Sequence, residues 1–459
     1  MTALTAAKHH MPLIIYSLLA SLPLAAKTPA PLWQGSSFGV PLDTKRPITK
    51  NTAIRVKIFP HRFSYPPHGK DLRTHKVTLR APQSCRQYAG LKKRSFSRGK
   101  VVRRGQIFTF RAKDLSSPVY LRCKGRVKLL RAKPLKSYEY VGSFYIRKNK
   151  KGQVEVVNLL SIKQYLKGVV PSEVFSGWPL ETLKAQAVAA RTYAVYHLSQ
   201  SRRNKRNRFY DVDDTIAFQA YTGVSHQTSR TDLAVNETKG QILTFGGHVI
   251  QAFFHADSGG QTEDAENVWQ KKVPYCRSKK EVFTTKKPTN AWRRRMSYWQ
   301  ITKKLRKRGV IGRKDVVKKV VAAAAGRTFS GRVKKVVLEL RGKRLKAVSY
   351  SKFARSLGSR RFPSRLFEFY NDRKRKRVTF SGRGFGHGVG MNQMGAFHLA
   401  KKEGWGYRQI LDFYYTNVKM CQLSRVSVKL AGCYDLQQKY KRKRQFTQNI
   451  PPKKPGFWP

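Results

Sequence analysis

Alternating apolar and polar residues between positions 52 and 145 restrict this part of the chain to short, half-buried strands. The clearest runs are "AIRVKIF", "HKVTLRA", "QIFTFRA", "VYLRCKG", "RVKLLRA" and "YVGSFYI", which are rich in β-branched and aromatic residues and separated by turn residues. They predict a small all-β domain. The run "GQVEVVNLL" (152–160) predicts one more strand that leads into the next unit.

Helical patterns follow. Ser161, with Gln164 three positions later, predicts a capped helix start, and Gly168 predicts its end. Pro179 suits a first helical turn, and the alanine-rich segment 180–198 has one apolar stripe typical of a core helix.

The second half of the chain is more mixed. We expect loops and strands over 209–275, a basic amphipathic helix over 290–308, and strands near "VKKVVLEL" and "KAVSYSKF". Two helices are expected in "MNQMGAFHLAKKEG" and "YRQILDFYY". The predicted fold class is therefore α+β, with a small β-rich domain in front of the larger domain.

The predicted domain organisation begins with an export signal over residues 1–26, where a basic start precedes an apolar run from Met11 to Leu24. A retained membrane anchor is the alternative, but it needs about 20 apolar residues. The β-rich domain is expected over 27–137, and the larger domain over 138–434 with a basic insertion near 277–375. A basic, disordered tail is expected over 435–459. We expect an exported protein of the periplasm or cell wall.

The charge is strongly one-sided. The chain has 95 Lys or Arg residues against 24 Asp or Glu, a formal net charge of +71. Twelve of the acids fall between Glu155 and Glu266, and the rest of the chain is almost purely basic. Such a field attracts polyanions, here anionic wall polymers or lipopolysaccharide, since export makes nucleic acid a less natural partner. Basic residues that merely cover solvated faces are the alternative.

The five cysteines fit an oxidising compartment. Two local disulfides, Cys85 with Cys123 and Cys421 with Cys433, would leave Cys276 free, and five free thiols are the alternative. Because no Cys-x-x-Cys spacing occurs, the sequence does not indicate a structural zinc site.

Glu173, in "LKGVVPSEVF" (166–175), is the strongest candidate for a catalytic group. Val169, Val170, Val174, Phe175 and Trp178 could surround it with apolar surface and raise the pKa of its carboxyl group. A carboxylic acid that is still protonated near neutral pH is what cleavage of a glycosidic bond requires. A helix-entry glutamate stabilised by the positive helix end is the alternative.

Two further segments contain candidate site residues. In "GRGFGHGVGMNQMGA" (382–396) the glycines alternate, which lacks the spacing of a dinucleotide loop but lets a backbone pass close to another chain or a ligand, with His387 in its middle. "FFHADSGGQTEDAENVW" (253–269) has His255, Asp257 and Ser258, but residues this close in a strand and turn seldom converge. There is also no G-x-S-x-G elbow, so a serine hydrolase is not favoured.

These segments, together with "YLKGVVPSEVFSGWPLETLKAQAVAARTYAVY" and "DDTIAFQAYTGV", occur in an order that resembles the family of stage II sporulation protein D and the LytB-type amidase enhancers. The resemblance covers roughly residues 138–420. It implies a lytic transglycosylase that cleaves peptidoglycan glycan strands, preferably strands whose stem peptides an amidase has removed. The catalytic glutamate of the family's V-P-S-E motif corresponds to Glu173.

The resemblance also suggests supporting residues. We expect sugar-binding or oxyanion-supporting groups at Gln219, Tyr221, His255, Ser258, His387 and Gln393, and structural support from Gln186 and Arg191. Some family members hold zinc through cysteines near the "SGG" segment. Here only His255 and the more distant Cys276 are present, so we expect no metal and no cofactor. The usual Trp of the family's G-W-G-H-G motif is Phe385.

Three functions are compatible with the sequence. The first is a lytic transglycosylase, which can use a single carboxyl group, whereas a glycoside hydrolase commonly needs two. The second is a non-catalytic glycan-binding protein that stimulates a cell-wall amidase, as enhancer members of the family do. A purely cationic wall-binding or nucleic-acid-binding role is a third, less favoured reading.

Overall fold

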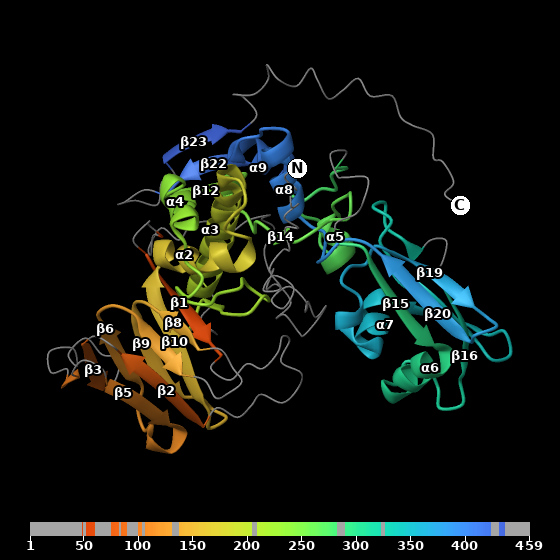
Figure 1. Cartoon of the computed structure of the whole chain (residues 1–459), viewed down its shortest axis with the longest axis horizontal. Coiled ribbons are helices and arrows are strands. Elements are labelled where there is room, and N and C mark those ends of the chain that lie inside the picture. Colours follow the sequence, from red (N-terminus) through yellow and green to blue (C-terminus); the bar gives the residue numbers. More distant parts are fainter. Residues whose placement is uncertain are drawn as a thin grey trace, which may run out of the picture.

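The computed structural model describes residues 48, 52–59, 75–81, 84–89, 100–102, 106–130, 137–203, 209–281, 290–322, 326–423 and 431–436. The predicted signal peptide and the predicted tail beyond Leu436 lie outside these residues. The fold is α+β, as predicted. A β-rich N-terminal domain, a helical central part and a separate insertion module can be followed in Figure 1 from red through green to blue.

Two sheets form the β-rich domain. The larger has the strand order β11-β1-β10-β9-β6-β3-β4 and the smaller has the order β5-β2-β7-β8. Alternate residues of β1, such as Ile54 and Val56, pack into a core that both sheets share. The elements are β1 (Ala53–Ile58), β2 (Lys76–Ala81), β3 (Cys85–Ala89), β4 (Lys100–Val102), β5 (Gln106–Arg111), η2 (Ala112–Asp114), β6 (Val119–Cys123), β7 (Val127–Leu130), β8 (Tyr138–Tyr140), β9 (Ser143–Lys148), β10 (Val154–Ser161) and β11 (Val212–Asp213).

Every predicted strand of this domain is present, and β3, β4 and β8 are additional. Because β8, β9 and β10 belong to the same two sheets as β1, the β-rich domain continues to Ser161, beyond the predicted boundary at residue 137. The short strand β11 joins β1 from the central part, and Asp211 beside it pairs with Arg55 at 2.7 Å.

The first central helix, α2 (Ile162–Glu173), begins as predicted but does not end at Gly168. Ser161 caps it, with its hydroxyl accepting from the N–H of Gln164 at 3.2 Å. A Cβ atom at Gly168 would lie 2.2 Å from the carbonyl oxygen of Gly223. The glycine therefore permits close packing inside the helix, which continues to Glu173.

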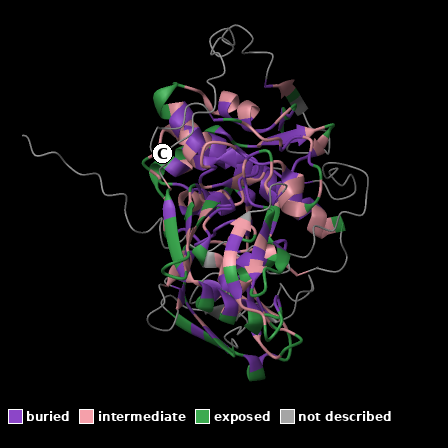
Figure 2. Ribbon diagram, turned by 90° about the vertical axis from the view of Figure 1, so that its right-hand side faces the viewer, coloured by how far each residue is buried: buried purple, intermediate pink, exposed green. Residues whose placement is uncertain are grey.

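The long helix α3 (Leu180–Arg203) is the centre of this part and is buried on almost all sides. Figure 2 shows that buried residues are concentrated in the upper half of the molecule. A four-stranded sheet of order β13-β12-β22-β23 and three more helices surround it. These elements are α4 (Ser229–Glu237), β12 (Gln241–Phe245), β13 (His248–Val249), α8 (Gln393–Lys402), α9 (Tyr407–Tyr414), β22 (Lys419–Gln422) and β23 (Ala431–Asp435).

The prediction of only loops and strands over 209–275 is wrong, since this segment also contains α4 and α5 (Ala265–Trp269). Thr228 caps α4 and accepts from the N–H of Thr231 at 3.3 Å. The two helices predicted near the C-terminus are present as α8 and α9.

The insertion module lies to one side of the central part, at the lower right of Figure 1. Its sheets have the orders β15-β20-β19 and β16-β17-β18. The side chain of Asn371 joins them, because it accepts from the N–H of Val320 at 3.0 Å and donates to its carbonyl at 2.8 Å. Two helices pack on the apolar face of these sheets. The elements are β15 (Trp292–Ser297), α6 (Tyr298–Lys307), β16 (Val317–Ala322), β17 (Lys335–Leu340), β18 (Leu345–Ser349), α7 (Tyr350–Leu357), η4 (Ser359–Arg361), β19 (Phe367–Asp372) and β20 (Arg377–Gly382).

The single helix predicted over 290–308 is wrong. The segment is a strand, β15, followed by the helix α6, which starts at Ser297 as its cap. Trp292 and Met296 are four positions apart and both buried, a spacing that suits a helix and a strand equally. The strand predicted in "KAVSYSKF" likewise stops at Ser349, where α7 begins.

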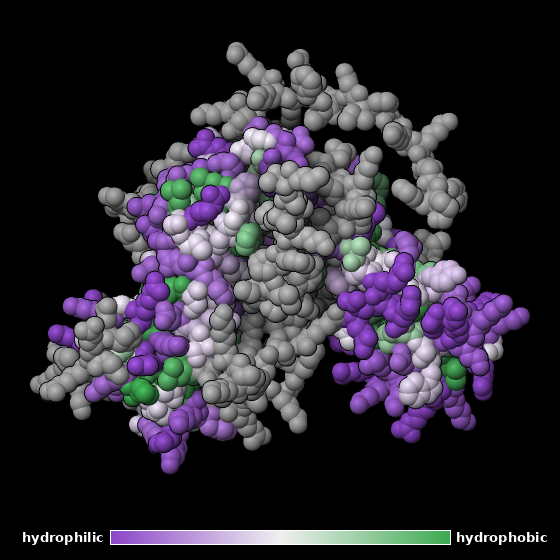
Figure 3. Space-filling view, viewed as in Figure 1, coloured by the Kyte–Doolittle hydropathy of each residue, from purple (hydrophilic) through white to green (hydrophobic). Residues whose placement is uncertain are grey.

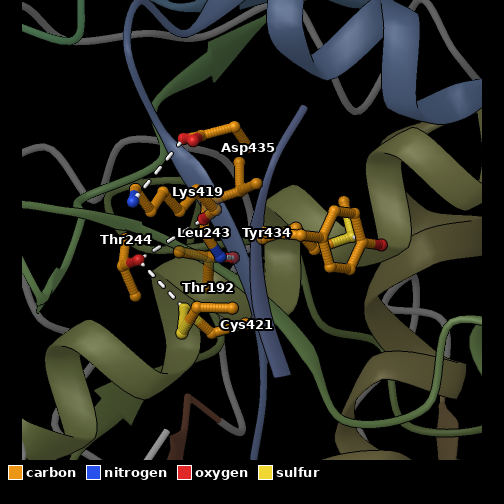
Figure 4. Close-up of a disulfide and its surroundings, with 9 residues drawn as sticks. Thr192, Leu243, Thr244, Lys419, Cys421, Tyr434 and Asp435 are labelled. Atoms are coloured by element: carbon orange, nitrogen blue, oxygen red, sulfur yellow. Dashed lines mark hydrogen bonds and ion pairs between the residues drawn. A yellow bond between two sulfur atoms is a disulfide. The ribbon is translucent and has the colours of Figure 1, made fainter. Parts of the chain in front are cut away.

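Both predicted disulfides are present, and Cys276 is a buried free thiol. Cys421 and Cys433 join β22 to β23 near the middle of α3. Figure 4 shows the hydroxyl of Thr244 next to the sulfur of Cys421, at 3.1 Å, and the N–H of Leu243 bonded to Thr192 at 3.0 Å. The bridge therefore holds the last two strands on the sheet that covers α3.

Candidate active site

Glu173 ends α2, so its carboxyl group lies at the point where this helix gives way to the loop before α3. Glu173 is therefore not a glutamate at the start of a helix, because the next helix, α3, begins only at Leu180. The N–H of Ala220 donates a 2.6 Å hydrogen bond to Oε1 of Glu173. The carboxyl group is thus fixed by a segment 47 residues further along the chain.

Burial is the main influence on the acidity of Glu173. The residue as a whole is half-buried, while protein atoms closely surround its carboxyl group. Loss of hydration raises its pKa from 4.5 to about 7, and the hydrogen bonds from Ala220 and from the side chain of Gln393 offset part of this rise. A substantial fraction of the group is therefore protonated at neutral pH.

The surroundings of Glu173 differ in part from the predicted apolar wall. Val170 and Val174 are buried, but Phe175 is 40% exposed. The predicted wall residue Trp178 packs against Phe397 of α8, with ring centroids 5.3 Å apart. Sequence spacing could not reveal this pair, because its members come from distant segments.

Gln393 bonds the side chain of Glu173, and Gln186 in turn contacts Gln393 in the interior. Gln393 is the first residue of α8, and its Nε2 donates to Oε1 of Gln186 at 3.3 Å. Gln393 is 3% exposed and Gln186 is fully buried. Gln393 therefore helps to hold the glutamate in place, and Gln186 supports Gln393.

Gln219 and Tyr221 flank Ala220 but face the protein interior. Gln219 donates to the carbonyl of Ala190 at 3.2 Å and accepts from the hydroxyl of Tyr165 at 3.3 Å. The hydroxyl of Tyr221 donates to Asn158 at 2.8 Å, and its ring is 2% exposed. The predicted contact of these two side chains with sugar is not supported by their positions. They instead anchor the backbone that presents the Ala220 N–H.

His255 and His387 come together in a second cluster. Their rings lie 5.5 Å apart, and Trp269 of α5 lies 5.0 Å from His387. They are placed by the parallel pair β14 (Phe254–His255) and β21 (Met391–Asn392). Burial lowers the pKa of both histidines, to about 3 for His387, so both rings are neutral.

The hydrogen bonds of these histidines go to backbone groups. Nδ1 of His387 accepts from the N–H of Val389 at 3.0 Å, and Nδ1 of His255 lies 3.1 Å from the carbonyl oxygen of Val389. His255 is 4% exposed, so direct contact with substrate is not supported for this residue. His387 is half-buried and keeps its predicted role as a candidate.

Ser258 takes part in a buried polar network and not in a catalytic triad. Its hydroxyl donates to Glu281, which also accepts from Asn392 at 3.0 Å and from the hydroxyl of Tyr414. Ser258 is fully buried, so the predicted contact with substrate is not supported. No sequence pattern indicated Glu281, Asn392 or Tyr414 as site residues, because each belongs to a different segment. The network joins the 253–269 segment to the start of α8.

The glycine-rich segment does pass close to other chain segments, as predicted. A Cβ atom at Gly390 would lie 2.1 Å from the carbonyl oxygen of Phe253, and one at Gly388 would lie 2.6 Å from the guanidinium of Arg332. Both glycines have positive φ angles, +71° and +85°. This close passage sets the position of Gln393 a few residues later.

Arg191 extends from α3 and is buried against the end of α4. There it donates to the carbonyl oxygens of Val235 and Gln241 at 3.1 and 3.2 Å. Burial lowers its pKa to about 9. Its place is structural, next to the last turn of a helix, where a cation is favourable.

His255 and Cys276 do not fit as the ligands of a zinc site. His255 bonds the backbone through Nδ1, and burial raises the pKa of the Cys276 thiol. Across the described ranges, no group of three or more His, Cys, Asp or Glu side chains is arranged to hold a metal. In the same ranges no helix has the length and apolar character needed to cross a bilayer.

Two family models match the chain. One, described as stage II sporulation protein (SpoIID), matches residues 150–245, and the other, a domain of unknown function (DUF8618), matches residues 263–390. The stage II sporulation protein D of Bacillus amyloliquefaciens is 32% identical over 278 residues, which are 58% of this chain and 76% of that protein. The chain belongs to the SpoIID family.

Other relatives have the same level of identity. An uncharacterized protein of Brachyspira hyodysenteriae is 33% identical over 296 residues, 64% of this chain and 75% of that protein. The amidase enhancer of Bacillus subtilis is 32% identical over 293 residues, 54% of this chain, but the match spans only 39% of the enhancer. The family expected from the motifs is confirmed, and it is linked to peptidoglycan remodelling. The SpoIID match contains Glu173, and the second match contains the insertion module.

Proposed function

We propose that this SpoIID-family protein is a lytic transglycosylase that cleaves the bond between N-acetylmuramic acid and N-acetylglucosamine in peptidoglycan glycan strands. The observation that carries the proposal is a single carboxyl group, that of Glu173, whose pKa is raised to about 7 by burial. It lies in the motif that matches the family's catalytic glutamate. In the proposal, the protein is exported to the periplasm or cell wall, as residues 1–26 predict.

Glu173 would act first as an acid and then as a base. Its proton passes to the oxygen that links C1 of the muramoyl residue to the next sugar, and the C1–O bond breaks. The carboxylate that remains takes the proton of the muramoyl 6-hydroxyl, and O6 closes on C1 to form the 1,6-anhydro ring. No water is consumed, and Glu173 ends the cycle protonated again.

The hydrogen bond from Ala220 supports both steps. It holds Oε1 at 2.6 Å and so keeps the carboxyl group in a fixed direction for both proton transfers. Gln393, which also bonds Glu173, keeps the carboxylate from becoming too basic after the first step. The proposal needs no second carboxyl group, which agrees with a site built on Glu173 alone.

The test uses glycan strands from which an amidase has removed the stem peptides. Purified protein is expected to release fragments with 1,6-anhydromuramoyl ends, measured by mass spectrometry. Glu173→Gln should lower the rate at least about 100-fold, since it cannot donate a proton. The matched control is Glu403→Gln, at an exposed glutamate at the end of α8. Equal product release by Glu173→Gln would refute the assignment.

A second candidate function is stimulation of a cell-wall amidase without glycan cleavage. It is supported by the similarity to the amidase enhancer of Bacillus subtilis. This function predicts glycan binding without new ends and a faster amidase when the two proteins are mixed. Anhydro ends formed by the purified protein alone would exclude it as the sole activity.

A further inference from the structure

The insertion module has a very uneven charge that glycan cleavage does not use. Between Trp292 and Gly382 the sequence has 30 Lys or Arg residues and four Asp or Glu. Figure 3 shows the module at the lower right with a largely hydrophilic surface. Where these few acids lie decides which face a polyanion could use.

Three of the four acids are on the side of the sheets that faces away from the helices. Glu339 and Glu368 alternate with core residues of β17 and β19, and Asp372 ends β19. Glu368 pairs with Arg327 at 2.6 Å, while Asp372 pairs with Arg377 at 3.3 Å and, at 3.7 Å, with Arg375 of the turn that follows β19. This face is therefore of mixed charge.

The helix side contains no acid in either α6 or α7. α6 buries Ile301 and Leu305 in the core and exposes Lys303 and Lys307. Trp299 is 67% exposed, and the ammonium group of Lys303 lies 4.9 Å from the centre of its ring. The exposed ring of Trp299 thus lies in a row with the positively charged side chains of α6.

Basic turns extend this row at both ends of α6. The N–H of Tyr298 donates to the carbonyl of Lys376 at 3.0 Å, which ties the "RKRK" turn (373–376) to the start of the helix. At the other end Arg306 donates to the carbonyl of Asp315 at 2.8 Å. Arg344 pairs with the side chain of Asp315, which brings the "RGKRLK" turn (341–346) to the end of the helix.

These residues make a continuous basic band, which we define as the exposed side of α6 with the turns 373–376 and 341–346. The ten residues of α6 alone span about 15 Å, at 1.5 Å per residue. A narrow row of this length fits an extended chain better than a flat lipid surface. The apolar stripe of α6 is also buried in the module core, so the helix cannot insert into a bilayer as an interfacial helix does.

We propose that the basic band binds a linear, phosphate-bearing polymer of the kind attached to cell-wall glycan. One guanidinium group can donate two parallel hydrogen bonds to the oxygens of a phosphate, and lysines add positive point charges along the polymer. Trp299 offers an apolar surface to the sugar or polyol between two phosphates. Among phosphate polymers, one of the wall fits a family linked to peptidoglycan remodelling.

The test measures binding of the full-length protein to purified poly(glycerol phosphate) at several salt concentrations. The band variant is Lys303→Gln/Lys307→Gln/Lys374→Gln. The matched control, Arg293→Gln/Arg295→Gln/Lys335→Gln, removes the same charge from exposed strand residues on the opposite face. We expect the band variant to bind at least about tenfold more weakly and its salt slope to fall by about 2. The control should change affinity by less than about twofold.

If both variants lost the same amount of affinity, the basic band would not be a specific site. Binding would then depend only on the net positive charge of the protein. Tighter binding of a thymidine oligonucleotide, or of phosphatidylglycerol vesicles, than of the wall polymer would overturn the choice of partner. Glu173→Gln should bind the polymer normally, and the band variant should still cleave strands that lack the polymer. Failure of this inference and failure of the proposed cleavage are therefore separate results.

Discussion

The backbone N–H of Ala220 and the carboxyl group of Glu173 are 2.6 Å apart, and this contact joins two segments that the sequence separates by 47 residues. This hydrogen bond lowers the pKa of Glu173, whereas burial raises it. The balance leaves the pKa at about 7, where a group can both give and take a proton. Several measurable properties depend on this balance.

The rate of glycan cleavage should depend on the protonation of Glu173. Because the first step needs the acid form, the rate should be constant at low pH and fall about tenfold per pH unit above about pH 7. The measurement is the initial release of anhydromuramoyl ends over a pH series. A rate that falls already near pH 4.5 would show that the carboxyl group is not desolvated in the active protein.

Gln393→Met should raise the pH above which the cleavage rate begins to fall. The amide of Gln393 lowers the pKa of Glu173, and methionine has a similar volume but no N–H to donate. The expected displacement is on the order of half a pH unit, without loss of the folded state. The same pH series measures it. If the rate began to fall at the same pH as in the natural protein, Gln393 would not bond the glutamate during turnover.

The stability of Glu173→Gln gives a test of the pKa that needs no substrate. In the folded state the pKa of Glu173 lies above its unfolded value of 4.5. Its contribution to stability is therefore complete below about pH 4.5 and is lost as the pH rises through about 7. The variant, which does not titrate, should gain on the order of 1–3 kcal/mol relative to the natural protein between about pH 4 and pH 8. Urea unfolding at both pH values measures this, with Glu403→Gln as the control that should show no gain.

Local pattern predicted much of the fold because strands and helix caps depend on nearby residues. The alternation in β1 and the Ser161–Gln164 cap are examples, and both are present. β15 was mistaken for a helix because its two buried residues, Trp292 and Met296, are four positions apart. The motif identified Glu173, and the resemblance suggested Gln393, which bonds it, but its other partner could not be predicted. The N–H of Ala220 has no side-chain signature, and the Ser258–Glu281 contact is set only by the tertiary fold.

The two disulfides should contribute measurably to stability. Cys85–Cys123 closes a loop of 38 residues and Cys421–Cys433 one of 12, so reduction should cost on the order of 2–4 kcal/mol for each bridge. Alkylation of the unfolded protein without reductant should modify one cysteine of the five, Cys276, as peptide mass mapping would show. Modification of three or more would contradict the pairing.

Arg332 should hold the insertion module to the glycine-rich segment. Its guanidinium is 1% exposed and donates to the carbonyl oxygens of Ser258 and Gln261 at 2.7 and 2.9 Å, directly under Gly388. Arg332→Met keeps the length of the side chain but leaves these buried acceptors without a donor, which should cost about 2–4 kcal/mol in the free energy of unfolding. Arg293→Met, at an exposed strand position, is the matched control and should cost less than about 0.5 kcal/mol. Urea unfolding monitored by tryptophan fluorescence compares the two. A loss below about 1 kcal/mol for Arg332→Met would mean that the module is held by other contacts, and the glycine-rich segment would then owe its position to the β14–β21 pair.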